Sequence, residues 1–159
     1  MRTRFSCLLL EAGPGRLEAV GDLLLAAGVA VERVPLAAAT GNPPAEATVV
    51  LADAKDAAGA DLLRRVVTPA WLRTRALVVL ARVGDSATIS RAVAMGADDA
   101  ACTPLDEQEL LERLDFAATF ARARAEAEAR DEILAAFRGG PAPAVPHLGP
   151  TSATAGASV

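Results

Sequence analysis

Aromatic residues are nearly missing from this sequence, which has four Phe, one Trp and no Tyr among 159 residues. The net charge is −4, and Arg and Glu are interleaved along the chain instead of forming blocks of one sign. The sequence therefore lacks both the stacking side chains and the basic patches on which nucleic-acid binding depends. No apolar run approaches the ~18 residues that span a bilayer. We expect a cytoplasmic protein that contacts neither nucleic acid nor membrane.

Metal-ligating and nucleophilic residue types are also scarce. The chain has two Cys and one His. Cys7 and Cys102 lie in apolar, strand-like runs, where a reduced and buried thiol is expected, and His147 lies in a Pro-rich segment. No Ser/His/Asp set, Cys/His pair or cluster of metal ligands is present in the sequence. We therefore expect no disulfide, no bound metal, no cofactor and no enzymatic activity.

Short apolar runs alternate with longer Ala/Leu/Arg stretches that have helical spacing. This alternation predicts repeated strand–helix units and a parallel sheet. We expect a first helix that starts at Pro14 and ends at Gly28, and an irregular second helix because 41-GNPP-44 breaks it. Strands are expected near Phe5–Leu10, Val29–Val34, Thr48–Ala52, Ala76–Arg82 and Ala100–Thr103, and further helices over Ala58–Val67, after Asp85, and over Glu107–Arg138.

The last expected helix is longer than one sheet requires. A helix that covers five strands needs roughly 12–15 residues, whereas no breaker interrupts this one before Gly139. It is either a solvated helix stabilised by Glu–Arg pairs or part of an Ala-rich two-stranded coil. We expect a first domain over 1–120, a projecting helix or coiled coil over 121–138, and a disordered linker or tail over 139–159. The seam of the coil would follow Leu111, Leu114, Ala118, Ala121 and Ala125, with Ile133, Leu134 and Phe137 as a second apolar cluster.

One segment has a more specific pattern, 76-ALVVLARVGDSATISRAVAMGADDAACTPLDEQELLERL-114. An apolar strand is followed by a helix that ends in Ala-x-x-x-Gly-Ala-x-Asp (92–99), then by a short strand, a Thr-Pro pair and an acidic helix. This order resembles a response-regulator receiver domain, the CheY-like family, over about residues 3–120. The resemblance implies an α/β, flavodoxin-like, doubly wound five-stranded parallel sheet of order 2-1-3-4-5 with an extended C-terminal helix. It also implies a cis bond before Pro104.

In that family, five positions at the carboxyl ends of the strands carry the phosphoryl chemistry. Two acidic residues after the first strand and an aspartate at the end of the third bind magnesium, and this aspartate accepts the phosphoryl group. A Ser or Thr after the fourth strand and a Lys after the fifth, next to the proline, hold the phosphoryl oxygens. The resemblance places Glu11, Ala12, Ala52, Ala81 and Thr103 at these five positions.

Four of these five residues lack the functional group of the family residue. Asp53 lies one residue beyond the acceptor position, and a one-residue offset turns a strand side chain to the opposite face unless the strand bulges or slips. Counting back from Gly59 places the acceptor near Leu51 instead, where there is no aspartate either. The sequence therefore predicts a pseudo-receiver, which keeps the receiver fold and has lost phosphoryl transfer.

The function expected from this pattern is that of a regulatory module of bacterial signal transduction, which could form the N-terminal part of a larger regulator. Two alternatives stay open. One is a working receiver that is phosphorylated on Asp53, supported by Glu11 and Asp56, and the other is a module that binds nucleotide phosphate in the loop 11–16. The paired Asp98 and Asp99 are interpreted as a solvated turn.

Expected partners are a second copy of the chain and a protein partner, either a kinase or an attached output domain. The resemblance implies a contact surface on the fourth helix, the fifth strand and the last helix, because receivers commonly use this face. Its residues are Ile89, Val93, Ala101, Leu105 and Leu111, together with Ala118 and Ala125 on the long helix.

Overall fold

A computed structural model describes residues 5–39, 47–104 and 106–139 of the chain. A parallel sheet of five strands in the order β2-β1-β3-β4-β5 forms its centre, which confirms the expected flavodoxin-like, doubly wound fold. The five strands are β1 (Ser6–Glu11), β2 (Ala30–Pro35), β3 (Val49–Asp53), β4 (Ala76–Arg82) and β5 (Asp99–Thr103). They lie within two residues of the ranges predicted from the sequence.

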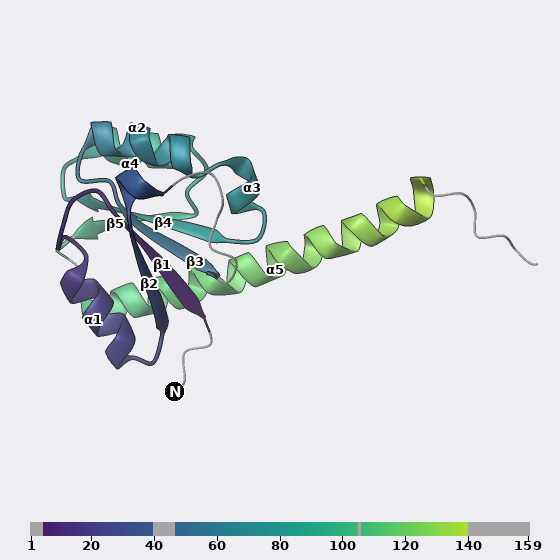
Figure 1. Ribbon diagram of the computed structural model, residues 1–159, viewed down its shortest axis with the longest axis horizontal. Helices are drawn as coiled ribbons and strands as arrows, with labels where there is room; N and C mark the ends of the chain where they lie inside the picture. The colour runs from purple at the N-terminus through teal and green to yellow at the C-terminus, as the bar shows by residue number, and fades with distance from the viewer. Residues whose placement is uncertain (1–4, 40–46, 105, 140–159) are drawn as a thin grey trace, which may run out of the picture. The chain divides into compact units, whose positions relative to one another are not determined.

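Helices cover both faces of this sheet (Figure 1). One face packs against α1 (Glu18–Ala26) and α5 (Glu107–Gly139). The other packs against α2 (Ala57–Val66), the short α3 (Pro69–Leu72) and α4 (Ser86–Ala94), together with the 3-10 turn η1 (Leu36–Ala38). In the described part of the chain, no helix has the length and apolar composition that crossing a membrane would require.

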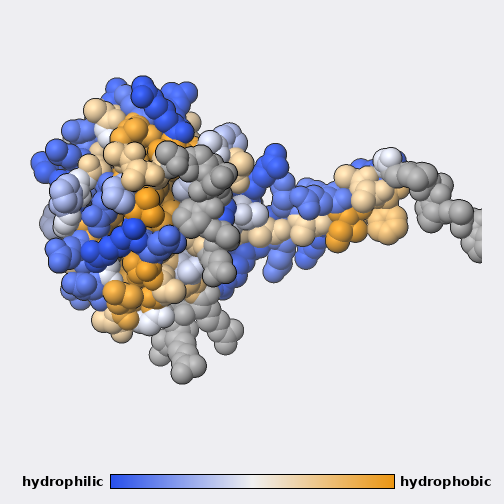
Figure 2. Space-filling view, in the orientation of Figure 1, coloured by the Kyte–Doolittle hydropathy of each residue, from blue (hydrophilic) through white to orange (hydrophobic). Residues whose placement is uncertain are grey.

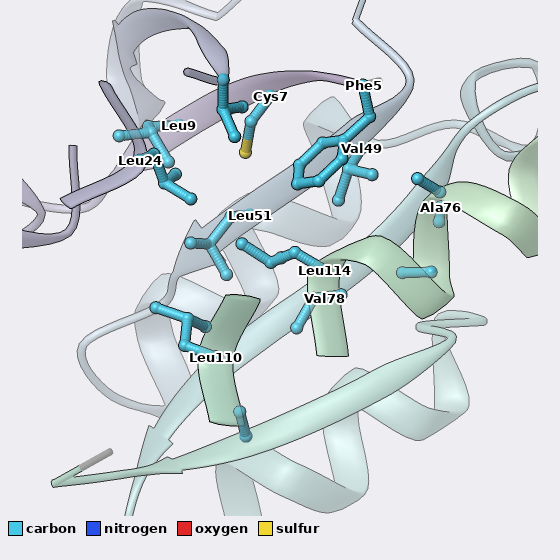
Figure 3. Packing of buried hydrophobic residues seen from close by; sticks show 14 of the residues in the cluster. Phe5, Cys7, Leu9, Leu24, Val49, Leu51, Ala76, Val78, Leu110 and Leu114 are labelled. Atoms are coloured by element: carbon cyan, nitrogen blue, oxygen red, sulfur yellow. The ribbon is translucent and has the colours of Figure 1, made fainter. Parts of the chain in front are cut away.

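The central strands are buried on both faces, as expected for a parallel sheet covered by helices. Successive side chains of a strand point to opposite faces, so Leu9 and Leu51 pack toward α1 and α5 while Leu8 and Val50 pack toward α2 and α4. Figure 3 shows Leu110 and Leu114 of α5 lying against Leu51 and Val78 of the sheet. The part of α5 that includes these leucines is therefore a core element of the domain.

The first helix differs from the sequence-based prediction. It begins at Glu18 instead of Pro14, because Gly15 has φ 74 and this left-handed conformation cannot continue a right-handed helix. In the described part of the region where an irregular second helix was expected, the structure has η1, a single 3-10 turn. The breaker 41-GNPP-44 lies outside the described residues.

The chain divides into two units, Met1–Glu128 and Ala129–Val159, and α5 passes from the first into the second. Within the first unit, α5 buries one continuous line of small and apolar side chains in the domain core. The seam predicted for a coil is wrong in this part, because Leu114, Ala118 and Ala121 are fully buried against the sheet. In the second unit, the helical residues 129–139 are all exposed, including Ile133, Leu134 and Phe137.

Candidate functional site

The strands β1, β3, β4 and β5 end together at one edge of the sheet. Strand register places Glu11 beside Asp53, and Asp53 beside Leu80. The neighbouring pair in β4 and β5 is Ala81 beside Cys102, followed by Arg82 beside Thr103. The structure therefore gathers at one edge most of the residues that the resemblance assigns to phosphoryl chemistry. This edge is also where open α/β sheets bind their ligands.

Asp53 is the last residue of β3 and continues its register without a bulge. It shares the sheet face of Leu51, and only 7% of its surface is exposed. Its carboxylate accepts hydrogen bonds from Arg16, with Nε 2.5 Å from Oδ2 and Nη2 3.3 Å from Oδ1. The N–H of Lys55 also donates to Oδ1 at 2.8 Å. The carboxylate of Asp53 is thus held by a cation and a backbone amide.

Local backbone geometry brings these groups to Asp53. Gly15 turns the chain before α1, so Arg16 follows directly on the turn and reaches the end of β3. Lys55 also has a left-handed conformation, with φ 65, which is costly for a residue with a Cβ. In return, its N–H faces the Asp53 carboxylate. The hydrogen bond to Asp53 also raises the pKa of the Arg16 guanidinium above its ordinary value.

Asp56, which the sequence offered as a support for Asp53, has a different task in the structure. It is the N-cap of α2, and its Oδ1 accepts the N–H of Gly59 at 2.9 Å. Gly59 itself lies so close to the preceding loop that a Cβ there would be 1.6 Å from the carbonyl oxygen of Ala54. The glycine that guided the alignment therefore allows the loop after β3 to pack on the first turn of α2.

The remaining candidate positions supply little chemistry. Ala52 faces the opposite side of the sheet from Asp53, in the core beneath α2, and Ala12 packs against the same cluster. Ala81 is 6% exposed and has no hydroxyl. The Thr103 hydroxyl donates to the carbonyl oxygen of Ala81 at 3.3 Å. The next residue, Pro104, follows a cis peptide bond, as the resemblance predicted.

Glu11 is the second carboxylate at this edge, and it differs from Asp53 in its partners. Its Oε1 atom is buried and has no hydrogen-bond partner within the described structure. Glu11 lines a hollow of about 300 Å³ together with residues from the glycine turn and from the end of β2, and no basic side chain lines it. Among the described residues, no group of three His, Cys, Asp or Glu side chains is placed to hold a metal ion.

The space beside Asp53 is small. A cavity of about 30 Å³ lies between Asp53, Arg16, Lys55, Ala81 and Thr103, which is about the liquid volume of one water molecule. A phosphoryl group or a hydrated metal ion is larger than this. Arg16 would have to leave Asp53 before either could bind the carboxylate directly.

The expected contact surface is only partly present. Val93 is 64% exposed, and Ile89, Leu111 and Ala125 are half-buried. Ala101 and Ala118 do not belong to an exposed surface, because they are 1% and 0% exposed within the monomer. Leu105 lies outside the described residues.

Sequence reasoning missed three arginines. Arg16 was not a candidate, because nothing in the glycine turn indicates that its first charged residue reaches β3. Arg113 pairs with Asp99 at 2.8 Å, and Arg124 pairs with Asp98 and donates to the carbonyl oxygen of Leu72 at 2.9 Å. Asp98 lies exposed in the bend before β5, as interpreted, whereas Asp99 is the first residue of β5. Both carboxylates also bind arginines of α5, which the sequence did not indicate.

Comparison with known proteins supports the fold and does not identify a family. No protein-family model matches the chain, and no curated protein matches it significantly. A response regulator receiver protein from Pseudoalteromonas atlantica has a similar structure, with 20% identity, a TM-score of 0.60, and coverage of 73% of this chain and 98% of that one. Full-length FixJ from B. japonicum gives 18% identity, a TM-score of 0.60, and coverage of 84% and 67%.

A third solved structure is a fusion that contains a trimeric coiled-coil segment of yeast Spc42. It has 17% identity and a TM-score of 0.62, and the match covers 86% of this chain and 90% of that one. At such low identities, structural similarity bears on the fold alone. The chain has the fold of response-regulator receiver domains.

Proposed function

We propose that this chain is a regulatory module of bacterial signal transduction that keeps the receiver fold without accepting a phosphoryl group, and that acts through protein–protein contacts. The single observation that carries the proposal is the ion pair between Arg16 and Asp53 at the edge of the sheet. The guanidinium occupies the side of the carboxylate where a metal ion or a phosphoryl group would have to bind. In this role the protein is a binding module and not an enzyme.

The neighbours of this ion pair support the same proposal. Phosphoryl transfer requires a metal with oxygen ligands and cationic or hydroxyl donors for the phosphoryl oxygens. Ala12 offers no ligand beside Glu11, and Ala81 offers no hydroxyl. Thr103 replaces the cation with a hydroxyl that is already donated to a carbonyl. A phosphoryl group on Asp53 would therefore meet no second metal ligand, hydroxyl or lysine at these three positions, and the cationic side chains that line its cavity are those of Arg16, Lys55 and Arg82.

A working receiver that uses Asp53 is the second candidate, and one observation favours it. Asp53 lies directly beside Glu11 in the strand register, at the end of β3. The unbroken register also turns Asp53 toward Arg16 at the functional edge, away from the core that holds Ala52. If Arg16 exchanged Asp53 for solvent, a carboxylate would be exposed at the position expected of an acceptor. The two candidates therefore differ in what Arg16 does.

Nucleotide binding by the loop 11–16 has less support. Arg16, the loop's basic side chain, is bound to Asp53. The hollow beside the loop is lined by the Glu11 carboxylate, which would repel a phosphate. We propose instead that the glycine turn serves to position Arg16.

Manganese, a paramagnetic substitute for magnesium, provides a test at the level of single residues. We expect that titrating manganese into the wild-type protein leaves the amide signals of Lys55 and Glu11 sharp in two-dimensional NMR spectra. The variant Ala12→Asp/Arg16→Ser restores a second carboxylate and removes the competing cation, so these signals should broaden. Arg33→Ser removes an arginine elsewhere in the domain and is the matched control. Broadening in the wild-type protein would favour the working receiver.

The proposed partners are a second copy of this chain and either a kinase or an attached output domain. The exposed apolar side chains Val93 on α4 and Phe116 on α5 support a contact role for this side of the domain. The helical residues beyond Glu128 add further exposed apolar side chains to the same element. The coiled-coil segment within one of the structural neighbours is in keeping with a long helix that associates.

A further inference from the structure

Helix α5 exposes large apolar side chains on a face beside the one it buries. Phe116 is 66% exposed and Phe120 is 51% exposed, and their rings pack edge to face with centroids 4.9 Å apart. The buried face of the same helix consists of Leu110, Leu114, Ala117, Ala118 and Ala121. These two sets differ by about a third of a turn, given 100° of rotation per residue. The phenylalanines therefore have no role in the domain core.

The exposed phenylalanines begin a regular repeat. Starting at Phe116, steps of four and three residues alternate to the end of the helix, giving an average period of 3.5 residues. Every member of this line is exposed, and apolar residues occupy six of its seven places. Figure 2 shows apolar side chains gathered toward the C-terminal end of α5, where this line ends. We call this line the α5 seam; its residues are Phe116, Phe120, Ala123, Ala127, Arg130, Leu134 and Phe137.

A period of 3.5 residues specifies the kind of partner. A straight α-helix has 3.6 residues per turn, so a repeat of 3.5 stays on one side only when the helix supercoils around another helix with a similar repeat. An isolated solvated helix has no reason to keep apolar residues at this spacing. The seam therefore fits another helix better than a flat surface or a small molecule.

The charges beside the seam favour a second copy of this chain over an acidic partner. Arg113 is bound to Asp99 and Glu109, and Arg124 is bound to Asp98. The basic groups next to the phenylalanines are therefore already paired within the domain. An acidic peptide would find few free cations there, whereas an identical apolar seam needs no counter-charge.

We propose that the α5 seam is the contact by which two copies of this chain associate, as a two-stranded coil of their α5 helices. The inference rests on the self-association named above and replaces the first part of the seam expected from the sequence, where Leu114, Ala118 and Ala121 are buried in the monomer. Ala123 and Ala127 allow the two helices to approach closely, and the larger side chains at both ends supply the apolar area. Arg130 is the one charged residue in the seam, and polar residues at such positions limit stability while fixing register.

The first test removes the two phenylalanines at the start of the α5 seam. The variant Phe116→Ser/Phe120→Ser should weaken the dimer at least tenfold, measured as the dissociation constant by sedimentation equilibrium, at about 1.4 kcal/mol per factor of ten. Both rings are largely exposed, so the monomer should keep its unfolding midpoint. Leu25→Ser is the matched control, because Leu25 is 55% exposed on α1 and its loss should leave the dimer unchanged. An unchanged dimer in the double variant would overturn the proposal.

The second test adds an apolar side chain to the α5 seam. A tighter dimer cannot be explained by loss of folding. Arg130→Leu completes the seam and should tighten the dimer at least tenfold. Glu132→Leu places the same side chain on the opposite face of the helix and should have little effect. Equal tightening by both variants would indicate non-specific adhesion and would also overturn the proposal.

Failure of this inference can be told apart from failure of the proposed function. If Val93→Ser dissociates the dimer and the seam variants do not, self-association holds and the seam is wrong. A wild-type chain that is monomeric at about 100 µM refutes both the seam and self-association, since mass action favours the dimer at high concentration. The statement that Asp53 accepts no phosphoryl group is tested separately, by metal binding and by labelling.

Discussion

Replacing Arg16 with methionine should destabilise the domain, because it leaves a carboxylate in a nearly buried place. Asp53 is 7% exposed, and without the guanidinium its one remaining hydrogen bond within the described structure comes from the N–H of Lys55. Breaking an exposed ion pair costs about 0–1 kcal/mol, and breaking a buried one about 3–5 kcal/mol. The side chain of Arg16 is 27% exposed, so we expect an intermediate loss of about 2 kcal/mol in the free energy of unfolding.

The opposite replacement should cost less. Asp53→Ala removes the buried charge and leaves an arginine that is long enough to turn its guanidinium to solvent, so about 1 kcal/mol is expected. The double variant should be more stable than Arg16→Met alone, because it no longer contains the unpaired carboxylate.

Urea unfolding followed by circular dichroism at pH 7 measures all three variants. A loss of about 2 kcal/mol also lowers the melting temperature by roughly 6–10 °C in a domain of this size. Two results would refute the reasoning. One is a loss below about 0.5 kcal/mol for Arg16→Met, which is the range of ordinary surface substitutions. The other is a double variant that is as unstable as the sum of the single losses, which would show that the two side chains do not interact.

Three further predictions concern other places in the domain. Lys55→Gly should raise the free energy of unfolding by up to about 1 kcal/mol. The left-handed conformation costs a lysine more than the loss of backbone entropy on folding costs a glycine. A lower urea midpoint in the variant would contradict this. Asp85 caps α4, and hydrogen bonds from the hydroxyl and amide of Thr88 lower its pKa. A carboxyl group whose pKa is lower in the folded state stabilises the protein at pH values above the pKa of the unfolded chain, and this stabilisation is lost as the pH falls. The wild-type protein should therefore be more stable than Asp85→Asn at pH 7. This difference in stability should shrink at pH values below 3.8, the ordinary pKa of an aspartate. A difference that does not change with pH would exclude the Asp85 charge as its cause. Burial raises the pKa of the Cys7 thiol to about 12, so iodoacetamide at pH 8 should alkylate Cys7 only after denaturation, as peptide mass mapping would show; alkylation in the native protein would indicate an open core.

The fold could be predicted further than the site, for physical reasons. Apolar periodicity specifies where strands and helices lie, and the pattern around Pro104 indicated the receiver fold and the cis bond. Periodicity does not specify which of two adjacent residues at the end of a strand points its side chain toward the functional edge. The sequence placed Ala52 at the functional position, whereas the register puts Asp53 beside Glu11. An alignment that is off by one residue in a strand exchanges the two faces of the sheet.

Long-range polar contacts were out of reach for the same kind of reasoning. Arg16 and Asp53 are 37 residues apart in the sequence, and no spacing rule connects a loop residue with the end of a distant strand. The long helix was predicted correctly from its lack of breakers, but the face it buries was not. Ala118 and Ala121 have the spacing of a coil seam, yet the sheet covers them. Alanine suits both a coil and a helix packed on a sheet, so the pattern alone could not decide between them.

Intact-mass spectrometry after incubation with acetyl phosphate and magnesium tests the central claim most directly. The account predicts that neither the wild-type protein nor Asp53→Asn gains mass in this treatment, because Arg16 occupies the Asp53 carboxylate and the magnesium ligands are incomplete. A receiver with all five functional residues, treated in parallel, shows that the reagent is active. A wild-type protein that gains the mass of one phosphoryl group, while Asp53→Asn does not, would contradict the account and establish a working receiver.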